Sequence, residues 1–278
     1  MSHGCENLNR QNTESDWPVI DKKPYFESDS IRLYFAESME VLGSMQTVES
    51  SKFDAIITDP PYCSGADTKS GRDADPASKY CHGGNTCGRP SFAGDHRDSR
   101  SFEFWATMWL ALARRHCKRS SYCLTFIDWR NLPLMVNIIQ AAGFVHKGVC
   151  VWDKGRAARA PHKGYFRHQA EYIPWGTNGP VPKLSDRGPF DGVYQHPIRQ
   201  ADKHHITGKP TPLMRDLVKA APIGGLIFDP FAGSGSTGVA AAIERRRAVL
   251  IEQSEEYCEI AAKRLDAAIR GEIMDRKT

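Results

Sequence analysis

The chain has 278 residues, of which 40% are hydrophobic and 10% aromatic, so it can bury a substantial core and is not a chain that is disordered throughout. A formal net charge of +4 permits a polyanionic partner but does not require one. No apolar run approaches the roughly 20 residues that cross a bilayer, and the polar start lacks the apolar segment of a secretion signal, so we expect a cytoplasmic protein without a membrane partner.

Strand and helix patterns alternate along most of the chain. We expect strands at 31–35, 53–58, 121–128, 144–155, 169–176, 224–230 and 248–253, and helices through Met39 and Leu42, at 101–117, at 131–143, at 211–220, through Ile243 and at 254–272. Because Ala55, Ile56 and Ile57 are consecutive and apolar, their strand should be covered on both faces, as in a parallel sheet. The repeated units predict an α/β fold with a doubly wound, mostly parallel sheet.

Three segments do not follow this alternation. Residues 1–27 are polar and aperiodic and are predicted to be a flexible tail, which leaves 28–278 as the folded domain. Residues 63–101 are rich in Gly, Ser, Asp and Arg, and we expect an inserted loop or lid there. Residues 177–204 form a second irregular segment.

The strand at 53–58 ends in an unusually stiff sequence, Asp59, Pro60, Pro61 and Tyr62. Proline fixes the backbone and cannot donate a hydrogen bond, so this end of the strand is rigid. Taken alone, four residues of this kind are also compatible with a turn that merely terminates a strand.

A glycine-rich turn follows a later strand. Gly233, Gly235 and Gly238 separate a hydrophobic strand from a helix, where glycine permits a tight turn and the close approach of a ligand to backbone amides. The turn lacks the Gly-Lys-Ser/Thr of a P-loop, but Glu252 ends the next strand 19 residues beyond Gly233, where an acid can bind ribose hydroxyls. The pattern predicts a nucleoside-like ligand, with an ordinary strand-to-helix turn as the alternative.

The combination of DPPY with DPFAGSGSTG resembles the S-adenosylmethionine-dependent amino methyltransferases of DNA, which methylate exocyclic nitrogens of bases. The DPPY block comes first, as in the permuted β class of that family. The resemblance extends from about Ile31 onward and includes HITGKPTPLM, where Ile206 and Gly208 replace the usual Pro and Gln. It implies a Rossmann-like methyltransferase fold with a sheet of the seven-stranded type.

The resemblance also implies S-adenosyl-L-methionine as the cofactor. Glu252 would bind the ribose, Thr207 and Lys209 would close over the methionine end, and Glu37 stands where many members carry an acid near the adenine, with a solvated carboxylate at a helix start as the alternative. The cofactor-binding residues expected in this way are Glu37, Thr207, Lys209, Asp229, Phe231, Gly233, Ser234, Gly235, Ser236, Thr237 and Glu252.

Asp59, Pro60, Pro61 and Tyr62 become the expected catalytic residues. The carboxylate of Asp59 and the carbonyl of Pro60 can both accept hydrogen bonds from an amino group. A base must leave the duplex at a cost of a few kcal/mol, and stacking on Tyr62 would return on the order of 1 to 3 kcal/mol. Asp at position 59, where Ser is typical of cytosine enzymes in this family, favours adenine in duplex DNA.

Three alternatives stay open: a cytosine N4 methyltransferase, a non-catalytic DNA-binding regulator with the same fold, and an enzyme that acts on RNA. The resemblance further implies a homodimer. Contacts to DNA are expected from residues 177–204 and from a basic stretch in which Arg156, Arg159, Lys163 and Arg167 are the candidates and Lys154 is a further basic residue.

No metal site is expected. Cys63, Cys81, His82, Cys87 and His96 cluster in the sequence, but their spacing fits no paired zinc-binding pattern.

Overall fold

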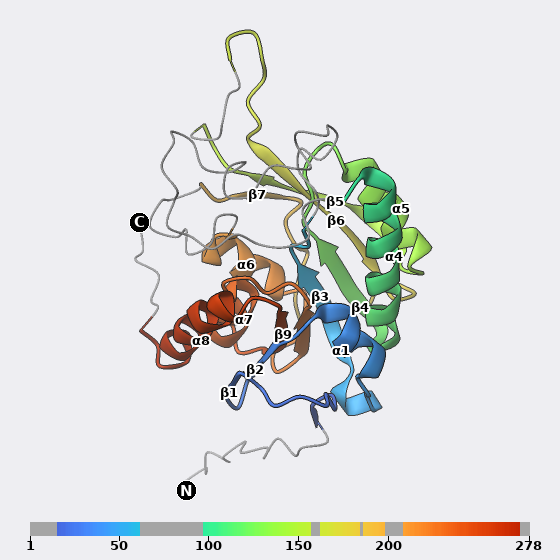
Figure 1. Ribbon diagram of the computed structural model, residues 1–278. Coiled ribbons are helices and arrows are strands. Elements are labelled where there is room, and N and C mark those ends of the chain that lie inside the picture. The colour runs from blue at the N-terminus through green and yellow to red at the C-terminus, as the bar shows by residue number, and fades with distance from the viewer. Residues whose placement is uncertain (1–15, 62–96, 157–161, 184–185, 198–207, 273–278) are drawn as a thin grey trace, which may run out of the picture.

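A computed structural model of the protein describes residues 16–61, 97–156, 162–183, 186–197 and 208–272 (Figure 1). Within these ranges, the helices all fall short of the length and apolar character that a membrane span requires.

The described strands form one nine-stranded sheet in the order β1-β2-β9-β8-β3-β4-β6-β5-β7. The strands β2, β9, β8, β3 and β4 run parallel to one another, whereas β1 and β6 pair with their neighbours in the antiparallel sense. Their bounds are β1 Phe26–Glu27, β2 Ile31–Phe35, β3 Phe53–Thr58, β4 Cys117–Thr125, β5 Val145–Asp153, β6 Ala170–Thr177, β7 Val193–Gln195, β8 Leu226–Asp229 and β9 Arg247–Glu252. The predicted α/β fold with a mostly parallel sheet is confirmed.

Helices cover both faces of the sheet, as the doubly wound pattern predicts (Figure 1). One face carries α1 (Ser38–Ser44), α4 (Ser99–Arg115) and α5 (Leu132–Ala141), and the other carries α6 (Thr211–Val218), α7 (Ser236–Ile243) and α8 (Glu255–Ile269). A short 3-10 helix, η2 (Glu49–Ser51), precedes β3. In β3 the side chains from Ala55 to Ile57 alternate between the two cores, and a register shift between Phe53 and Ala55 leaves Phe53 in the same core as Ile56. The expectation that this strand is covered on both faces is therefore confirmed.

The segment predicted as a tail is shorter than the sequence suggested. Trp17 is only 5% exposed, and the guanidinium groups of Arg32 and Arg247 lie 4.6 and 5.1 Å from the centre of its ring. Val19 forms two backbone hydrogen bonds with Gln46, and β1 adds an antiparallel strand to the sheet edge. Residues 16–27 thus belong to the folded domain, because one buried Trp anchors a segment whose polar composition shows no periodicity.

The two irregular segments also contain regular structure where they are described. The last residues of 63–101 form the first turn of α4, which the side chain of Asp98 caps by accepting a hydrogen bond from the N–H of Ser101 at 2.8 Å. Within 177–204, Val193–Gln195 pairs in parallel with β5 as β7. A three-residue strand is too short to produce a readable alternation.

Two helical glycines should respond oppositely to alanine. A methyl group at Gly238 in α7 would collide with Leu250 and lie 2.8 Å from Cδ2 of Leu265, whereas nothing lies within 4 Å of one at Gly43 in α1. We expect Gly238→Ala to lower the free energy of unfolding by about 1 to 3 kcal/mol and Gly43→Ala to raise it by about 0.5 kcal/mol. Urea unfolding of both variants checks this, and a neutral Gly238→Ala would contradict the packing described for α7.

Candidate active site

The motif residues that the structure describes lie at the carboxyl ends of neighbouring strands of the sheet. Figure 1 labels three of these strands, β2, β9 and β3. The strands β2, β9, β8 and β3 are parallel neighbours, so their carboxyl ends lie side by side. Glu37 follows β2, Glu252 ends β9, the glycine turn follows β8, and Asp59 follows β3. The two motifs, which are 170 residues apart from Asp59 to Asp229, are brought together because β3 and β8 pair directly.

Asp59 directly follows the carboxyl end of β3 and forms an ion pair with Lys209. Its Oδ2 accepts a hydrogen bond from Nζ of Lys209 at 2.5 Å, and the side chains are 21% and 5% exposed. Its Oδ1 is buried and has no hydrogen-bond partner among the described residues. Burial raises the pKa of Asp59 to about 6 against the lowering effect of Lys209, so the carboxylate is ionised at neutral pH. An anionic oxygen without a donor is therefore held ready for one.

Glu171 is a member of this site that the sequence analysis missed. Nζ of Lys209 lies 3.4 Å from its Oε2, and Nζ of Lys154 lies 3.1 Å from its Oε1. Burial alone would raise the pKa of Glu171, but Lys209 and Lys154 outweigh burial and lower it. Glu171 comes from β6 and carries no motif, so only the fold reveals it. Lys154, grouped by sequence with the exposed basic residues, is instead engaged here.

Lys209 is enclosed from several directions. Besides the two carboxylates, its Nζ lies 4.9 Å from the centre of the Phe126 ring and 6.0 Å from that of Trp152. Burial would lower the pKa of Lys209, but Asp59 and Glu171 outweigh it and raise the pKa. The structure places the ammonium group of Lys209 against Asp59, and its position at the methionine end of a cofactor stays a prediction.

Asp229 ties the glycine turn to the rest of the site. Its carboxylate accepts hydrogen bonds from Oγ1 of Thr58 at 2.6 Å, from Oγ1 of Thr237 at 2.5 Å and from the N–H of Phe231 at 3.1 Å. Burial raises the pKa of Asp229, while these donors oppose the rise. The side chain links β8 to the end of β3 and to α7, which sets the distance between the two motifs.

Arg264 of α8 donates hydrogen bonds to the glycine turn. Its Nη1 donates to the carbonyl of Ser234 at 2.5 Å, to Oγ of Ser234 at 3.0 Å and to Oγ of Ser236 at 3.3 Å. The side chains of Ser234, Ser236 and Thr237 are all buried. The hydroxyl groups of Ser234 and Ser236 thus help to hold the turn against α8.

The turn and Glu252 are joined by backbone donors. Gly233 and Gly235 have φ angles of 52° and 78°, in the region that favours glycine. The N–H of Gly233 donates to Oε2 of Glu252, and that of Ser254 donates to Oε1, both at 2.8 Å. Burial raises the pKa of Glu252, against the effect of these donors. The carboxylate of Glu252 therefore connects the glycine turn to the end of β9.

The two remaining cofactor candidates flank this group. Glu37 is exposed and caps α1 by accepting from the N–H of Glu40 at 2.9 Å, which is the helix-start arrangement held as the alternative for it. It lies next to Glu252, because Phe35 pairs with Glu252 across β2 and β9. The ring of Phe231 packs against Trp109, with ring centres 5.1 Å apart.

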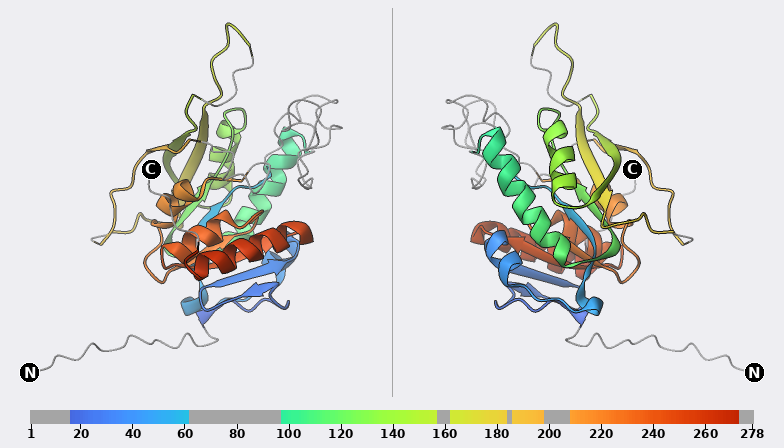
Figure 2. Two further views of the ribbon diagram at one scale, coloured as in Figure 1. Left: turned by 90° about the vertical axis from the view of Figure 1, so that its left-hand side faces the viewer. Right: turned by 90° about the vertical axis from the view of Figure 1, so that its right-hand side faces the viewer.

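Three of the four basic residues predicted to contact DNA are described, and they lie in the connection between β5 and β6, whose described part projects from the domain in both side views (Figure 2). Arg156, Lys163 and Arg167 are exposed there, and Nη1 of Arg167 donates to the carbonyl of Arg156 at 3.1 Å. Tyr62, Thr207, Arg159 and the clustered cysteines and histidines at 63–96 lie outside the described residues.

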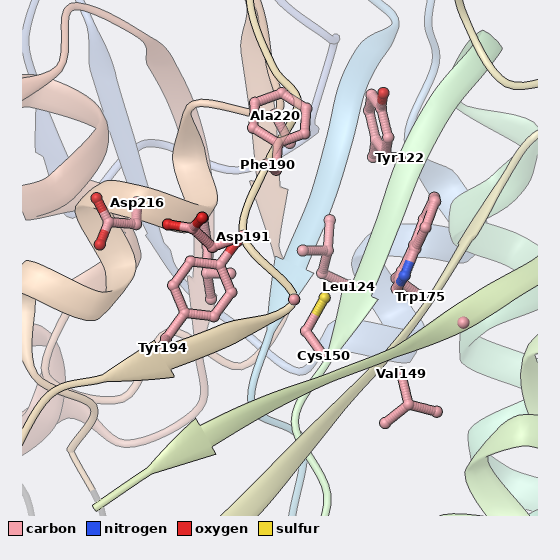
Figure 3. Close-up of a pocket in the computed structure, with 13 residues that line it drawn as sticks. Tyr122, Leu124, Val149, Cys150, Trp175, Phe190, Asp191, Tyr194, Asp216 and Ala220 are labelled. Carbon is pink, nitrogen blue, oxygen red and sulfur yellow. The ribbon is translucent and has the colours of Figure 1, made fainter.

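A separate cavity of about 310 Å³ lies between the sheet and α6 (Figure 3). Its lining includes the four aromatic residues Tyr122, Trp175, Phe190 and Tyr194. It contains none of the motif residues, so it is distinct from the site at the strand ends.

Known DNA methyltransferases are similar to this chain in sequence and fold. The type II methyltransferase M2.DpnII of Streptococcus pneumoniae is 27% identical over 267 residues, which cover 90% of this chain and 94% of that protein. The crystal structure of an M1.HpyAVI–SAM complex is similar with a TM-score of 0.61 and 21% identity, covering 85% of this chain and 99% of that one. PvuII DNA methyltransferase (cytosine-N4-specific) has a TM-score of 0.66 and 16% identity, covering 94% of this chain and 92% of that one.

The two solved structures establish the fold, and the family follows from the match to a family model. The family model for DNA methylases of the N6/N4 type matches residues 53–263, a range that contains the Asp59 motif, Glu171, Lys209 and the glycine turn. Because this range covers more than half of the chain, the protein belongs to the DNA methylase family, the S-adenosylmethionine-dependent amino methyltransferases of DNA that its two motifs resemble.

Proposed function

We propose that the protein methylates the exocyclic amino nitrogen of an adenine that is flipped out of duplex DNA. The observation that carries this proposal is the buried Oδ1 of Asp59, an anionic acceptor without a partner among the described residues, beside the glycine turn. An acceptor that binds an amino N–H favours the pyramidal, more nucleophilic form of the nitrogen. The rigid Pro60 adds a carbonyl acceptor next to it.

The residues at the glycine turn fit S-adenosylmethionine. Glu252 offers carboxylate oxygens for ribose hydroxyls, and the positive φ angles of Gly233 and Gly235 form the tight turn beside it. Glu37 stands one strand further along the edge, and Phe231 adds an apolar wall. The cofactor supplies an electrophilic sulfonium methyl group when it is bound. The proposed set further includes Thr207, Lys209, Asp229, Ser234, Ser236 and Thr237.

The chain's own contribution to the reaction is to hold and orient the target. Asp59 accepts one N–H of the amino group, and Tyr62 stacks on the extruded ring. Because burial raises the pKa of Asp59 only to about 6, its carboxylate stays charged at neutral pH and stabilises the positive charge that develops on the nitrogen. The nitrogen then loses its proton to Asp59 or to water.

The projecting hairpin is the proposed DNA-binding side of the molecule. It begins at Lys154 and ends near Glu171, which Lys209 links to Asp59, and its described part combines the exposed Lys163 and Arg167 with Phe166, which is 94% exposed. Cationic side chains suit phosphates, and an exposed ring suits contact with bases. Arg156, Arg159 and residues 177–204 stay further proposed contacts to DNA. The homodimer stays a prediction.

Cytosine N4 methylation is the second candidate, since PvuII DNA methyltransferase, named as cytosine-N4-specific, shares the fold across 94% of this chain. Asp59 favours adenine because the family resemblance associates Ser with cytosine at this position. The test is nucleoside mass spectrometry and long-read sequencing of DNA from cells that express the protein or its Asp59→Ala variant. We expect N6-methyladenine at a defined sequence, absent with the variant. N4-methylcytosine would overturn the choice of base, and unmodified DNA would support the regulator.

A further inference from the structure

Four charged side chains form an alternating row that ends at Asp59. Nζ of Lys154 lies 3.1 Å from Oε1 of Glu171, whose Oε2 lies 3.4 Å from Nζ of Lys209, which lies 2.5 Å from Oδ2 of Asp59. The residues come from the end of β5, from β6, from the segment before α6 and from the end of β3. The row is neutral as a whole, and none of its side chains is more than 21% exposed.

Stability is a weak reason for such a row. Taking charges out of water costs several kcal/mol for each ion, and buried ion pairs often stabilise a protein no better than apolar residues of the same volume. The row also leaves Oδ1 of Asp59 without a donor among the described residues, which adds to its cost. A group retained at this cost beside a reacting centre points to a role in the reaction.

We propose that Glu171 is a positioning residue for methyl transfer, which holds Lys209 on one oxygen of Asp59 so that the other oxygen faces the target amino group. This inference rests on the proposed function. Lys209 has few other positions, because the rings of Phe126 and Trp152 stand 4.9 and 6.0 Å from its Nζ. Lys154 in turn fixes the second oxygen of Glu171.

The geometry explains why two carboxylates are needed. A carboxylate can rotate about its last bond, and a single donor on Oδ2 fixes the plane of Asp59 only if that donor is itself fixed. Lys209 is a flexible point charge with three donors, so a second anion is required to hold its direction. Glu171 provides this anion through an ion pair at 3.4 Å, although its buried Oε2 has no hydrogen-bond partner among the described residues.

The row also sets the charge of Asp59. The groups that act on it are Lys209, which lowers its pKa, and Glu171 and Asp229, which raise it against the background of burial. Glu171→Gln therefore removes a negative charge and should lower the pKa of Asp59. Lys209→Met removes a positive charge and should raise it. If the row served stability alone, neither substitution would shift the pH profile of kcat.

The test measures kcat from pH 5 to 9 for the wild type, Glu171→Gln, Lys209→Met and the double variant. We expect Glu171→Gln to lower the plateau of kcat by about tenfold and to move its acidic limb to lower pH. Lys209→Met should lower kcat at pH 7 by about 100-fold and move that limb to higher pH. The double variant removes one charge of each sign, so it should recover thermal stability without recovering kcat.

A readout without DNA or cofactor supports the same test. A raised carboxyl pKa in the folded state means that stability falls as pH rises from the unfolded pKa through the folded one. In Lys209→Met the decline of the melting temperature should therefore continue to higher pH than in the wild type. The matched control is Lys118→Met, which breaks a 2.9 Å pair with Asp54 at the other end of β3. It should lower the melting temperature and leave the pH profile of kcat unchanged.

The outcomes separate this inference from the proposed function. If the wild type transfers no methyl group to any DNA, the proposed function fails. If the wild type is active and the pH profile of kcat for Glu171→Gln has the same plateau and the same acidic limb as that of the wild type, the positioning role is overturned. Recovery of kcat by the double variant would overturn it as well, because the row would then serve stability alone.

Discussion

Replacing Asp59 by asparagine is expected to lower kcat for methyl transfer by on the order of 10³-fold. The change keeps the shape of the side chain but removes its charge, and it leaves the positive charge that develops on the target nitrogen without an anionic partner. It also removes the anion against which Lys209 is held at 2.5 Å. Rapid-quench measurement of a single turnover, with cofactor and DNA both saturating, reports this step directly.

Two controls separate chemistry from folding and binding in this variant. The carboxylate of Asp59 is disfavoured by burial, which raises its pKa to about 6, so the neutral asparagine should keep the melting temperature of the wild type. Cofactor affinity measured by calorimetry should also be unchanged, since the glycine turn is held by Asp229 and Arg264 instead. A variant that keeps more than a tenth of the wild-type rate would contradict the role of Asp59.

The pH dependence of the wild type follows from the same group. Asp59 must be charged to accept the amino group, and burial raises its pKa to about 6. The rate of the chemical step should therefore fall as pH falls through about 6 and level off above pH 7. The acidic limb is expected to be absent in Asp59→Asn, whose residual rate has no carboxylate to protonate at this position.

Replacing Glu252 by alanine is expected to weaken S-adenosylmethionine binding by about 100-fold. The side chain accepts from the N–H groups of Gly233 and Ser254, so its loss releases the turn at the same time as it removes the proposed acceptor for the ribose. Hydrogen bonds to a charged group contribute about 1.5 to 3 kcal/mol each, and a factor of 100 corresponds to about 3 kcal/mol. Isothermal titration calorimetry with purified protein measures the effect.

Glu256→Ala provides the matched control for this prediction. Glu256 is an exposed carboxylate in the first turn of α8, four residues after Glu252, and it should affect cofactor affinity by less than about twofold. Glu252→Gln keeps one acceptor oxygen and should fall between alanine and the wild type. Equal affinities for Glu252→Ala and Glu256→Ala would show that the cofactor binds elsewhere.

The sequence predicted the parts of the fold that depend on local pattern. Apolar runs located the central strands, and the two motifs identified Asp59 and the glycine turn because each combines unusual residues within a few positions. The adjacency of the motifs was also predictable, since parallel strands end at one edge. The pairing of β3 with β8 supplies that adjacency.

The parts that the sequence did not predict depend on contacts between distant residues. Glu171 is one acid among many in the sequence, and its link to Lys209 exists only because β6 runs antiparallel beside β4. In the sequence, Lys154 is indistinguishable from the exposed basic residues around it, and only the structure shows its ion pair with Glu171. Trp17 shows the same limit, because one buried ring in a polar segment leaves no periodic signal.

A crystal structure of the protein with duplex DNA and a non-reactive cofactor analogue tests the central claim most directly. The account predicts an extruded adenine whose amino nitrogen lies within about 3.2 Å of Oδ1 of Asp59, with Lys209 still on Oδ2 and the analogue at the glycine turn beside Glu252. A target base that binds away from Asp59, or an ammonium group of Lys209 standing between the two, would contradict it.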